Sequence, residues 1–415
     1  MVSTSSTTGS PLVLDPYDYD FHEDPYPLYA RLRDEAPLFH SEADDFWALT
    51  RHADVFDAFR DDATFSNQMG VTLDASAWSP DAHRVMSFLA LDGAEQSRIR
   101  RLVSAAFTPR RVRELEPEVQ RLTEHYLSQA LLDNAENGEV DWISTVAGRL
   151  PMDVISEMMG VPVSDRDEVR RLADLLVHRE AGVRDVPPAG MEAAFALFGY
   201  YAEMVKQRRA APSDDLTSAL VEAELDGDRL TDQEIIAFLT LMVVAGNETT
   251  TKLLGNALFH LSAHPDQQAT VFAPSAGTDL VAPWVEETLR FDTSTQMLAR
   301  YVTKDVHLHG RTMPAGSKLL LFLGAANRDE RVFTRPADFL ISRSREELSE
   351  SLSFGTGRHF CLGANLARLE ARIVLAELVR RVEGFEVHAD RAVRVHSVNV
   401  RGFASLPTTF RLRGA

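Results

Sequence analysis

The sequence of 415 residues contains a single cysteine. One thiol cannot form an internal disulfide or a zinc site built from several cysteines, and such scarcity is typical of proteins from a reducing compartment. Long apolar runs are also missing, because the stretch from Ile235 to Gly246 is shorter than the roughly 20 residues that a membrane-spanning helix needs. No Gly-x-Gly-x-x-Gly fingerprint follows a predicted strand, so we expect no nicotinamide site.

Basic residues are outnumbered, since 43 Lys and Arg stand against 62 Asp and Glu and leave a formal net charge of −19. This charge argues against nucleic-acid binding. The start of the chain lacks the basic and apolar regions of a signal peptide, so we expect a cytoplasmic protein that binds no membrane. No Pro-rich or Gly-rich linker divides the chain. We expect a disordered polar tail over residues 1–12 and a single domain over residues 13–415.

The lone cysteine lies in a glycine-rich segment, Phe354-Gly355-Thr356-Gly357-Arg358-His359-Phe360-Cys361-Leu362-Gly363. Such glycines are typical of a backbone with positive φ, or of close approach to a flat group. Apolar residues at 3,4 spacing then predict an amphipathic helix over residues 362–382. Because Cys361 lies where this helix begins, we expect the free amides and the positive helix end to lower the pKa of its thiol. A thiolate there serves as a nucleophile or as a metal ligand, and thiolate is a known proximal ligand of haem iron.

A second unusual segment lies inside a long predicted helix. Thr231 and Glu234 form a capping box, and the helical pattern continues to about His264 before Pro265. Its first half is apolar almost all round, which predicts burial. In the middle lies the run Ala245-Gly246-Asn247-Glu248-Thr249-Thr250. Glycine and a charged side chain are both costly inside a buried helix, and such exceptions are expected at functional sites. The alternative is a glycine required by packing and a solvated glutamate.

Together the two segments resemble the cytochromes P-450. The cysteine segment fills every fixed position of Phe-Gly-x-Gly-x-His/Arg-x-Cys-x-Gly, and the helical segment is similar to Ala-Gly-x-Asp/Glu-Thr. The resemblance covers the chain from about Pro25 to Leu412. It implies a mainly α fold with small β-sheets, shaped as a helical triangular prism. It also implies that haem b lies between the long central helix and the helix after the cysteine, with Cys361 as the metal ligand and O2 as co-substrate.

The resemblance also implies roles for individual residues. Phe354 would shield the sulfur, and Ala245 and Gly246 would leave room for O2. Thr249 and Glu248 would be catalytic, because together they hydrogen-bond the oxygen and deliver protons. The propionates of haem would pair with Arg100, Arg300 and His359. The implied cofactor-binding residues are therefore Gln96, Arg100, Ala245, Gly246, Arg300, Phe354, Gly355, His359, Cys361 and Gly363.

Other residues that carry the resemblance are structural or lie at the surface. Gln96 stands where relatives usually have His, so we expect weaker anchoring of haem. Glu287 and Arg290 resemble the family's Glu-x-x-Arg pair, with Arg343 as the third member of a structural network. A basic cluster is either a solvated helix face or a docking site for a ferredoxin. Its members are Arg98, Arg100, Arg101, Arg110, Arg111 and Arg113.

The expected substrate pocket is mostly apolar, as such pockets usually are. Its expected lining residues are Leu89, Leu241, Val244, Ala245, Gln296, Leu298 and Asn399. Arg401 is a further polar candidate. Each of these is equally well read as an ordinary loop or helix residue.

The activity that the resemblance implies is the hydroxylation or epoxidation of an apolar or amphiphilic small molecule. Natural-product and lipid or steroid metabolism are the expected settings. A ferredoxin and its reductase would supply electrons, since no reductase domain is fused here. Two alternatives stay open: oxidative coupling or ring closure without oxygen insertion, and a haem-thiolate binding or sensor protein. A thiol enzyme without haem is a more distant alternative.

Overall fold

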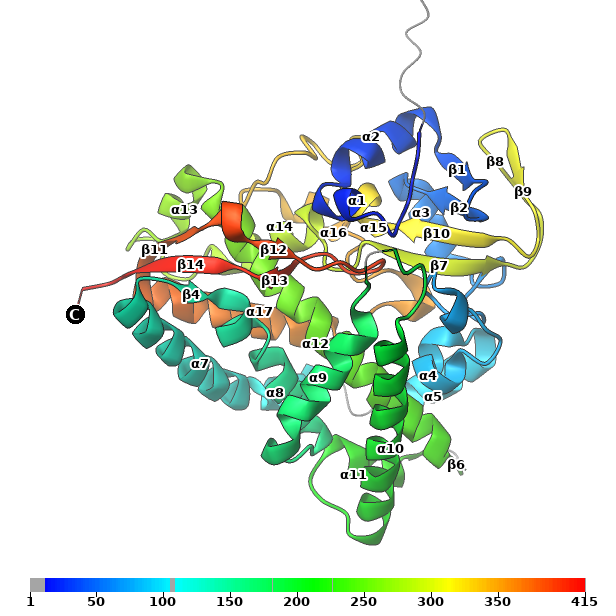
Figure 1. Ribbon diagram of the computed structural model, residues 1–415, viewed down its shortest axis with the longest axis horizontal. Coiled ribbons are helices and arrows are strands. Elements are labelled where there is room, and N and C mark those ends of the chain that lie inside the picture. Colours follow the sequence, from blue (N-terminus) through cyan, green and yellow to red (C-terminus); the bar gives the residue numbers. More distant parts are fainter. Residues whose placement is uncertain (1–11, 105–108, 181, 226, 415) are drawn as a thin grey trace, which may run out of the picture.

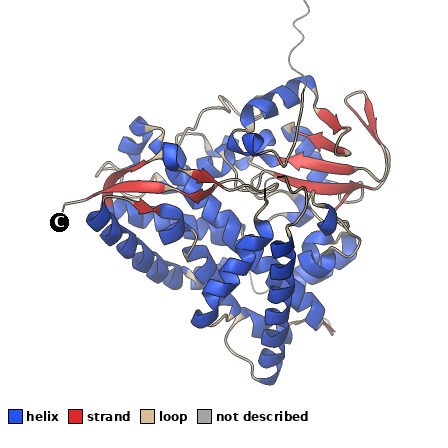
Figure 2. Ribbon diagram, viewed as in Figure 1, coloured by secondary structure: helices blue, strands red, loops and turns tan. Residues whose placement is uncertain are grey.

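The computed structural model describes residues 12–104, 109–180, 182–225 and 227–414. Of the expected tail, only Leu12 falls among them, and the other positions lie outside the described residues. Helices make up most of the molecule, and its outline in Figure 1 is roughly triangular. Figure 2 shows that the longer strands gather in two separate regions. This arrangement confirms the mainly α fold with small sheets.

Helices follow one another along most of the chain. The α-helices are α1 (Tyr19–Glu23), α2 (Tyr26–Glu35), α3 (His52–Arg60), α4 (His83–Met86), α5 (Gly93–Ser104), α6 (Pro109–Glu114), α7 (Glu116–Asn137), α8 (Leu150–Met159), α9 (Arg166–Val177), α10 (Pro188–Ala210), α11 (Leu216–Glu222), α12 (Asp232–Ser262), α13 (Pro265–Val271), α14 (Val281–Phe291), α15 (Leu323–Ala326), α16 (Arg345–Ser349) and α17 (Ala364–Arg381). The predicted helix after the cysteine is therefore confirmed, with Gly363 at its N-cap.

The larger sheet joins strands that are far apart in the sequence. Its order is β1 (Leu38–Ser41), β2 (Phe46–Leu49), β10 (Lys318–Phe322), β7 (Met297–Val302) and β3 (Phe65–Ser66). The β2–β10 pair is parallel and the other pairs are antiparallel. Leu319 on β10 lies between Trp47 on β2 and Arg300 on β7. The sheet thus fixes the position of Arg300.

The remaining strands form smaller sheets. A three-stranded sheet has the order β11 (Val382–Val387), β14 (Pro407–Leu412) and β4 (Val140–Asp141). The two-stranded pairs are β5 (Glu224–Leu225) with β6 (Asp228–Arg229), β8 (Val306–Leu308) with β9 (Arg311–Met313), and β12 (Val393–Arg394) with β13 (Phe403–Ser405).

Helix α12 runs through the middle of the molecule (Figure 1). Its predicted capping box is present, because Thr231 and Glu234 bond reciprocally. The prediction of an apolar first half that is buried all round is wrong in part. Leu241 and Val244 keep exposed surface, and Ala245 is exposed. One face of this half is therefore left open.

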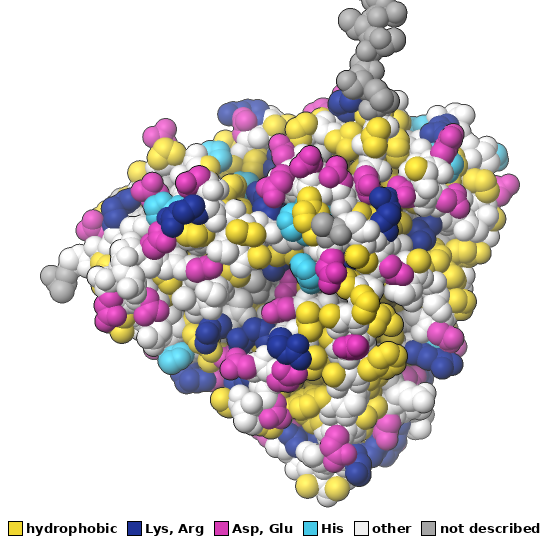
Figure 3. All heavy atoms as spheres, in the orientation of Figure 1, with side chains coloured by type: hydrophobic (Ala, Val, Ile, Leu, Met, Phe, Trp, Pro, Cys, Tyr) yellow, Lys and Arg dark blue, Asp and Glu magenta, His cyan; other side chains and the backbone are white. Residues whose placement is uncertain are grey.

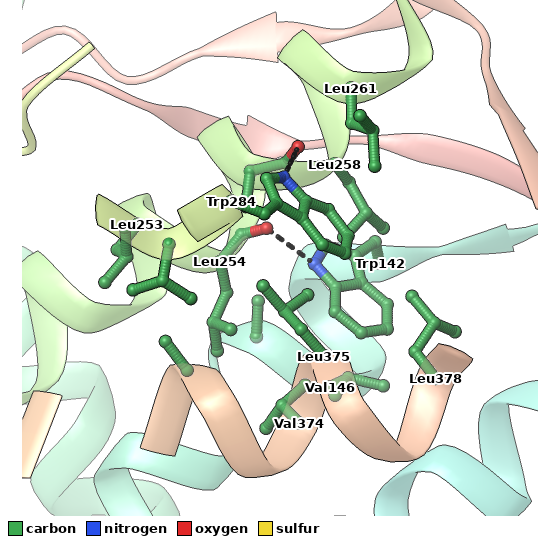
Figure 4. Packing of buried hydrophobic residues seen from close by; sticks show 14 of the residues in the cluster. Trp142, Val146, Leu253, Leu254, Leu258, Leu261, Trp284, Val374, Leu375 and Leu378 are labelled. Carbon is green, nitrogen blue, oxygen red and sulfur yellow. Dashed lines mark hydrogen bonds between the residues drawn. The ribbon is translucent and has the colours of Figure 1, made fainter. Parts of the chain in front are cut away.

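The second half of α12 is enclosed by the core (Figure 4). Trp142 donates its indole N–H to the Leu254 carbonyl at 3.2 Å, and Trp284 donates to the Ala257 carbonyl at 3.0 Å. Val374 and Leu375 of α17 belong to the same cluster of buried residues. Burial of both indole rings with their N–H groups bonded holds the backbone of α12 firmly at this point.

No helix among the described residues combines the length and apolar character needed to cross a bilayer. Apolar side chains do gather on the face shown in Figure 3, over α10. Met191 and Phe195 of this helix are 38% and 74% exposed.

Candidate active site

The cysteine loop is held by its own backbone and by α3. The amide of Cys361 donates to the Phe354 carbonyl at 2.9 Å. Gly355 and Gly357 adopt φ of +65° and +70°, which explains two of the glycines. A Cβ on Gly357 would lie 3.0 Å from the Phe59 carbonyl oxygen, so the loop also approaches α3 closely. Gly363 has ordinary φ, and a Cβ there would meet no described atom within 4 Å.

The thiol of Cys361 does not have the lowered pKa that its position predicted. Burial raises the pKa, although the amides of Gly363 and Ala364 and the charges of Arg100 and Arg368 act in the opposite direction. The side chain still keeps exposed surface. A thiol with a raised pKa is a poor nucleophile at neutral pH, whereas a coordinated cation removes the proton from a thiol. This difference favours the metal-ligand interpretation over the nucleophile.

Three predicted cationic partners of haem converge next to this loop. His359 lies near Asp92, Arg300 and Arg100, and burial together with the two arginine charges lowers the pKa of His359 despite Asp92. The His359 side chain is 4% exposed, and its Nε2 lies 3.7 Å from the Asp92 carboxylate. Neither ring nitrogen has a hydrogen-bond partner among the described residues. A buried imidazole with both nitrogens unbonded is expected to have a further partner.

Arg300 is buried in the same region. It is 2% exposed, and its guanidinium donates a hydrogen bond to the neighbouring Ala299 carbonyl at 2.7 Å. Burial lowers the pKa of Arg300 to about 10, although Asp92 acts in the opposite direction. The guanidinium lies 4.9 Å from the Phe59 ring centroid. Among the described residues, Arg100, Arg300 and His359 share the single carboxylate of Asp92 in this region, so positive charge is left uncompensated. The three side chains therefore fit the propionates of haem.

Asp92 is the acidic residue that sequence reasoning missed in this region. Burial opposes its ionisation, but the nearby imidazole of His359 and hydrogen bonds from Ser66 and the Asn67 amide hold the pKa of Asp92 below its ordinary value. Its carboxylate is therefore occupied by protein partners. Ser66 ends β3, far from Asp92 in the sequence, so local pattern alone gave no signal for this contact.

Gln96 and Arg100 bond the cysteine loop itself. Gln96 is 1% exposed and donates its amide to the Arg358 carbonyl at 3.0 Å. Arg100 donates to the Phe360 carbonyl at 2.7 Å, and burial lowers its pKa although Cys361 acts in the opposite direction. The replacement of His by Gln96 thus ties α5 to the loop that carries the cysteine.

The middle of α12 combines a packing glycine with a buried acid. A Cβ on Gly246 would lie 3.4 Å from Ile155 of α8, so glycine permits close packing of these helices. The Glu248 side chain is buried rather than solvated, with 5% exposure. Thr249 donates its hydroxyl to the Ala245 carbonyl at 2.9 Å. Packing thus explains Gly246, while Glu248 requires another explanation.

Glu287, Arg290 and Arg343 meet in one buried network. Arg290 donates to both Glu287 oxygens at 2.7 and 2.9 Å, and Arg343 donates to Glu287 at 3.0 Å. Their side chains are at most 1% exposed. Remaining arginine N–H groups bond the carbonyls of Asn327 and Thr334. The network therefore joins α14 to the segment before the cysteine loop.

A cavity of about 750 Å³ opens between α4, α5, α10 and the first turns of α12. Its lining includes Ile99, Phe198, Ile236 and Ala237. None of the predicted pocket residues lines it, but Leu241 lies one helical turn beyond Ala237 on the same face of α12. The volume is in the range of small-molecule sites.

The predicted polar lining needs correction. The Gln296 amide donates to the Thr293 carbonyl at 2.7 Å and accepts from the Tyr29 hydroxyl at 3.2 Å. Arg401 bonds Asp292 at 3.0 Å. Because both side chains are buried and bonded within the protein, neither is free to orient a substrate.

Asn399 differs from these two residues. It is half-buried, and its side-chain amide makes no hydrogen bond to a described residue. Leu89 and Leu298 are also half-buried. These three residues therefore keep surface that a ligand could contact.

The predicted basic cluster is smaller than the sequence suggested. Arg98 pairs with Asp228 and Glu234, both at 2.6 Å, and Arg110 pairs with Glu114 at 2.9 Å. The Arg111 side chain lies outside the described residues. Arg101 and Arg113 remain as exposed arginines of the cluster, and Phe360, next to the cysteine in the sequence, is also exposed.

Comparison with known proteins decides the family. The Cytochrome P-450 family model matches residues 189–273 and 279–413. A putative cytochrome P-450 123 of Mycobacterium tuberculosis is 55% identical over 406 residues, which cover 98% of this chain and 99% of that protein. The chain is a cytochrome P-450. It is thus an oxidoreductase of the monooxygenase type, and the family uses haem-thiolate iron, O2 and electrons from redox partners.

Two further relatives of this cytochrome P-450 bear on fold and function. A vitamin D(3) 25-hydroxylase of Pseudonocardia autotrophica is 37% identical over 410 residues and covers 97% of each chain. A cytochrome P-450 structure from Chondromyces apiculatus superposes with a TM-score of 0.85 at 32% identity, covering 97% of this chain and 99% of that one. The cytochrome P-450 fold predicted from the two motifs is therefore confirmed.

Proposed function

We propose that this cytochrome P-450 binds haem b through Cys361 and hydroxylates an apolar or amphiphilic lipid or steroid-like molecule. The observation that carries the cofactor assignment is the buried positive cluster beside the cysteine loop. Within the part of the chain that the structure describes, both ring nitrogens of His359 are unbonded and the hydrogen bond of the Arg300 guanidinium goes to a neutral carbonyl. Carboxylates satisfy both kinds of donor. When bound, haem-thiolate iron supplies the activation of O2.

The residues of α12 have separate roles in this proposal. Ala245 is exposed, and its small side chain would leave space for the cofactor and O2. Thr249 would offer its hydroxyl as a hydrogen-bond donor to the substrate oxygen, and Glu248, one residue away on α12, would hold a proton. Delivery of protons to that position is a form of general acid catalysis.

Removal of the Thr249 hydroxyl tests this assignment. In Thr249→Ala we expect haem to bind normally while electrons are diverted to peroxide, so product formed per electron falls. The measurement compares peroxide and product at equal consumption of reduced donor. Unchanged coupling of electrons to product would argue against the role of Thr249.

The substrate class rests on the cavity and on relatives. The lining of the cavity is mixed: Ile99, Phe198 and Ile236 are apolar, whereas Arg84, Glu95 and Arg98 are charged, and Arg98 is paired with Asp228 and Glu234. Such a lining suits an amphiphilic molecule with a large apolar part. Besides the vitamin D(3) 25-hydroxylase, a methyl-branched lipid omega-hydroxylase of Mycobacterium tuberculosis is 35% identical over 398 residues.

A screen by the haem spectrum tests the substrate class. We expect a secosteroid or a methyl-branched fatty acid to shift the spin state of the iron, and turnover to add one oxygen to its mass. A product without added oxygen would instead support coupling or ring closure. If neither class shifted the spectrum while smaller polar molecules did, the substrate proposal would be wrong.

The electron donor is proposed to be a ferredoxin that docks around Phe360. This side chain is 44% exposed, and Arg101 and Arg113 lie exposed on α5 and α6. A charge-reversed variant, Arg101→Glu with Arg113→Glu, should raise the KM for an acidic ferredoxin several-fold and weaken its salt dependence. Lys206→Glu, at an exposed side chain of α10, serves as the control for reversal of one surface charge away from this patch.

A further inference from the structure

The acid in the middle of α12 has a basic neighbour on its own helix. Glu248 and Lys252 are 5% and 4% exposed, and the Lys252 ammonium lies 3.0 Å from the Glu248 carboxylate. The contact is not a well-directed hydrogen bond, because Oε2 of Glu248 has no hydrogen-bond partner among the described residues. Burial of an incompletely bonded carboxylate is costly, so a further group is expected at this position.

Asp174 of α9 supplies that group. Helix α9 packs against α12, and the Asp174 carboxyl lies close enough to Glu248 to share a hydrogen bond. Asp174 keeps exposed surface, whereas Glu248 does not. The two carboxyl groups therefore form a path for protons from water, through Asp174, to Glu248 beside Thr249.

The charges around Asp174 favour a shared proton. Desolvation and the neighbouring charge of Glu248 raise the pKa of Asp174 to about 7, although Lys252 and Arg170 act in the opposite direction. Two carboxyl groups in contact cannot both ionise without cost, so one proton belongs to the pair. Arg170 also faces Asp153 at 3.8 Å and Asp167 at 3.1 Å, which divides its positive charge among several carboxylates.

We propose that Asp174 is the outer proton donor of this enzyme and that it acts through Glu248. The inference rests on the proposed function and extends it by one residue on another helix. In each transfer Asp174 gives its proton to the Glu248 carboxylate, and Glu248 passes the proton inward past Thr249. Water then returns a proton to Asp174. Reduction of O2 consumes these protons together with electrons from the redox partner.

Lys252 has a positioning role in this scheme. Its ammonium, four residues from Glu248 on α12, holds the acceptor carboxylate in place between turns. Asp174 can take up protons directly from water, because its side chain is exposed to solvent.

The test replaces Asp174 by Asn in the haem-loaded enzyme. We expect product formed per electron to fall about 3- to 10-fold, which is less than the 10²- to 10⁴-fold of direct general acid catalysis because water replaces an outer donor in part. The limb of the pH–rate profile near neutrality should disappear. The solvent isotope effect on turnover should increase, and Asp174→Glu should restore all three properties.

A readout without turnover accompanies these measurements. A protonated-carboxyl infrared band that titrates near pH 7 in the resting wild-type protein should be lost in Asp174→Asn, whereas the band of buried Glu370, whose pKa burial raises to about 8, should remain in both proteins. Glu168→Gln is the matched control, because Glu168 lies on the same helix and pairs at the surface with Arg171. We expect this control to behave as wild type.

The outcomes separate this inference from the proposed function. If Thr249→Ala loses coupling but Asp174→Asn retains the wild-type profile and infrared band, the outer donor is wrong and the monooxygenase assignment stands. If neither variant changes coupling, the proton-delivery role of α12 fails as well.

Discussion

The cysteine loop and the middle of α12 serve the same reaction, but one is built from backbone groups and the other from side chains. The loop is built from backbone: glycines with positive φ, an amide of Cys361 bonded to Phe354, and Gln96 bonded to the Arg358 carbonyl. The middle of α12 is built from side chains, with Glu248 and Lys252 buried in a regular helix. A loop of fixed backbone suits a permanent ligand, whereas protonatable side chains in a helix suit a step that repeats at each turnover.

Replacement of the ligand should produce the largest effect. In Cys361→Ser we expect no thiolate-type carbon monoxide spectrum and no detectable product, because a hydroxyl does not replace the thiolate ligand. Thr249→Ala should keep that spectrum and lose only coupling. If Cys361→Ser retained the spectrum, the division between ligand and proton delivery would be wrong.

Removal of the buried Glu287 carboxylate behind the cysteine loop should cause the largest fall in the free energy of unfolding. Glu287→Ala leaves Arg290 and Arg343 without their carboxylate, which should lower the free energy of unfolding by about 3–5 kcal/mol. Glu286→Ala is the matched control on the same helix. Its pair with Arg368 is about one-third exposed, so we expect a loss below about 1 kcal/mol.

Urea unfolding measures both changes. Similar losses in the two variants would show that the network adds no more than a surface pair, and that the rigidity of the loop comes from its backbone alone.

Part of this comparison could be predicted from the sequence and part could not. The loop is contiguous, so its glycines and cysteine are visible as one pattern. The capping box locates the start of α12, and Pro265 locates its C-terminal end within two residues. The sign of the Cys361 pKa shift was wrong, because the helix position is local whereas burial depends on the whole fold.

The contacts between distant segments were not predictable from one sequence. Asp174 reaches Glu248 from α9, and Ser66 reaches Asp92 from β3. Gln296 was expected in the pocket by resemblance to the family, yet its amide bonds Thr293 and Tyr29. Such pairings depend on which helices and strands pack together, and periodicity carries no information about that choice.

Removal of a buried cation beside the cysteine loop should have a moderate effect on the affinity for haem. Arg300→Met should weaken haem binding about 10- to 100-fold, as loss of an outer partner of a metal site does. The measurement is the rate of haem transfer to apomyoglobin. Arg311→Met on β9 is the control, because Arg311 lies over Trp47 and bonds the Leu38 carbonyl away from the loop. Equal transfer rates for both variants would contradict a propionate contact for Arg300.

Glu370 on α17 extends the comparison to the buried side of the cysteine helix, and its effect should be the smallest. It is 2% exposed, its Oε2 has no partner among the described residues, and burial raises its pKa to about 8. Above the ordinary pKa near 4.5, the unfolded chain releases this proton while the folded protein keeps it, so stability falls as pH rises until about pH 8. Between pH 6 and 7 the free energy of unfolding should fall by about 1 kcal/mol, and Glu370→Gln should remove this pH dependence in urea unfolding.

The control is Glu377→Gln, on the same helix but paired with Arg380 and Arg381, which should keep the slope of stability against pH. A slope that survives in Glu370→Gln would mean that another group titrates, and that the cysteine helix tolerates a buried carboxylate as well as α12 does.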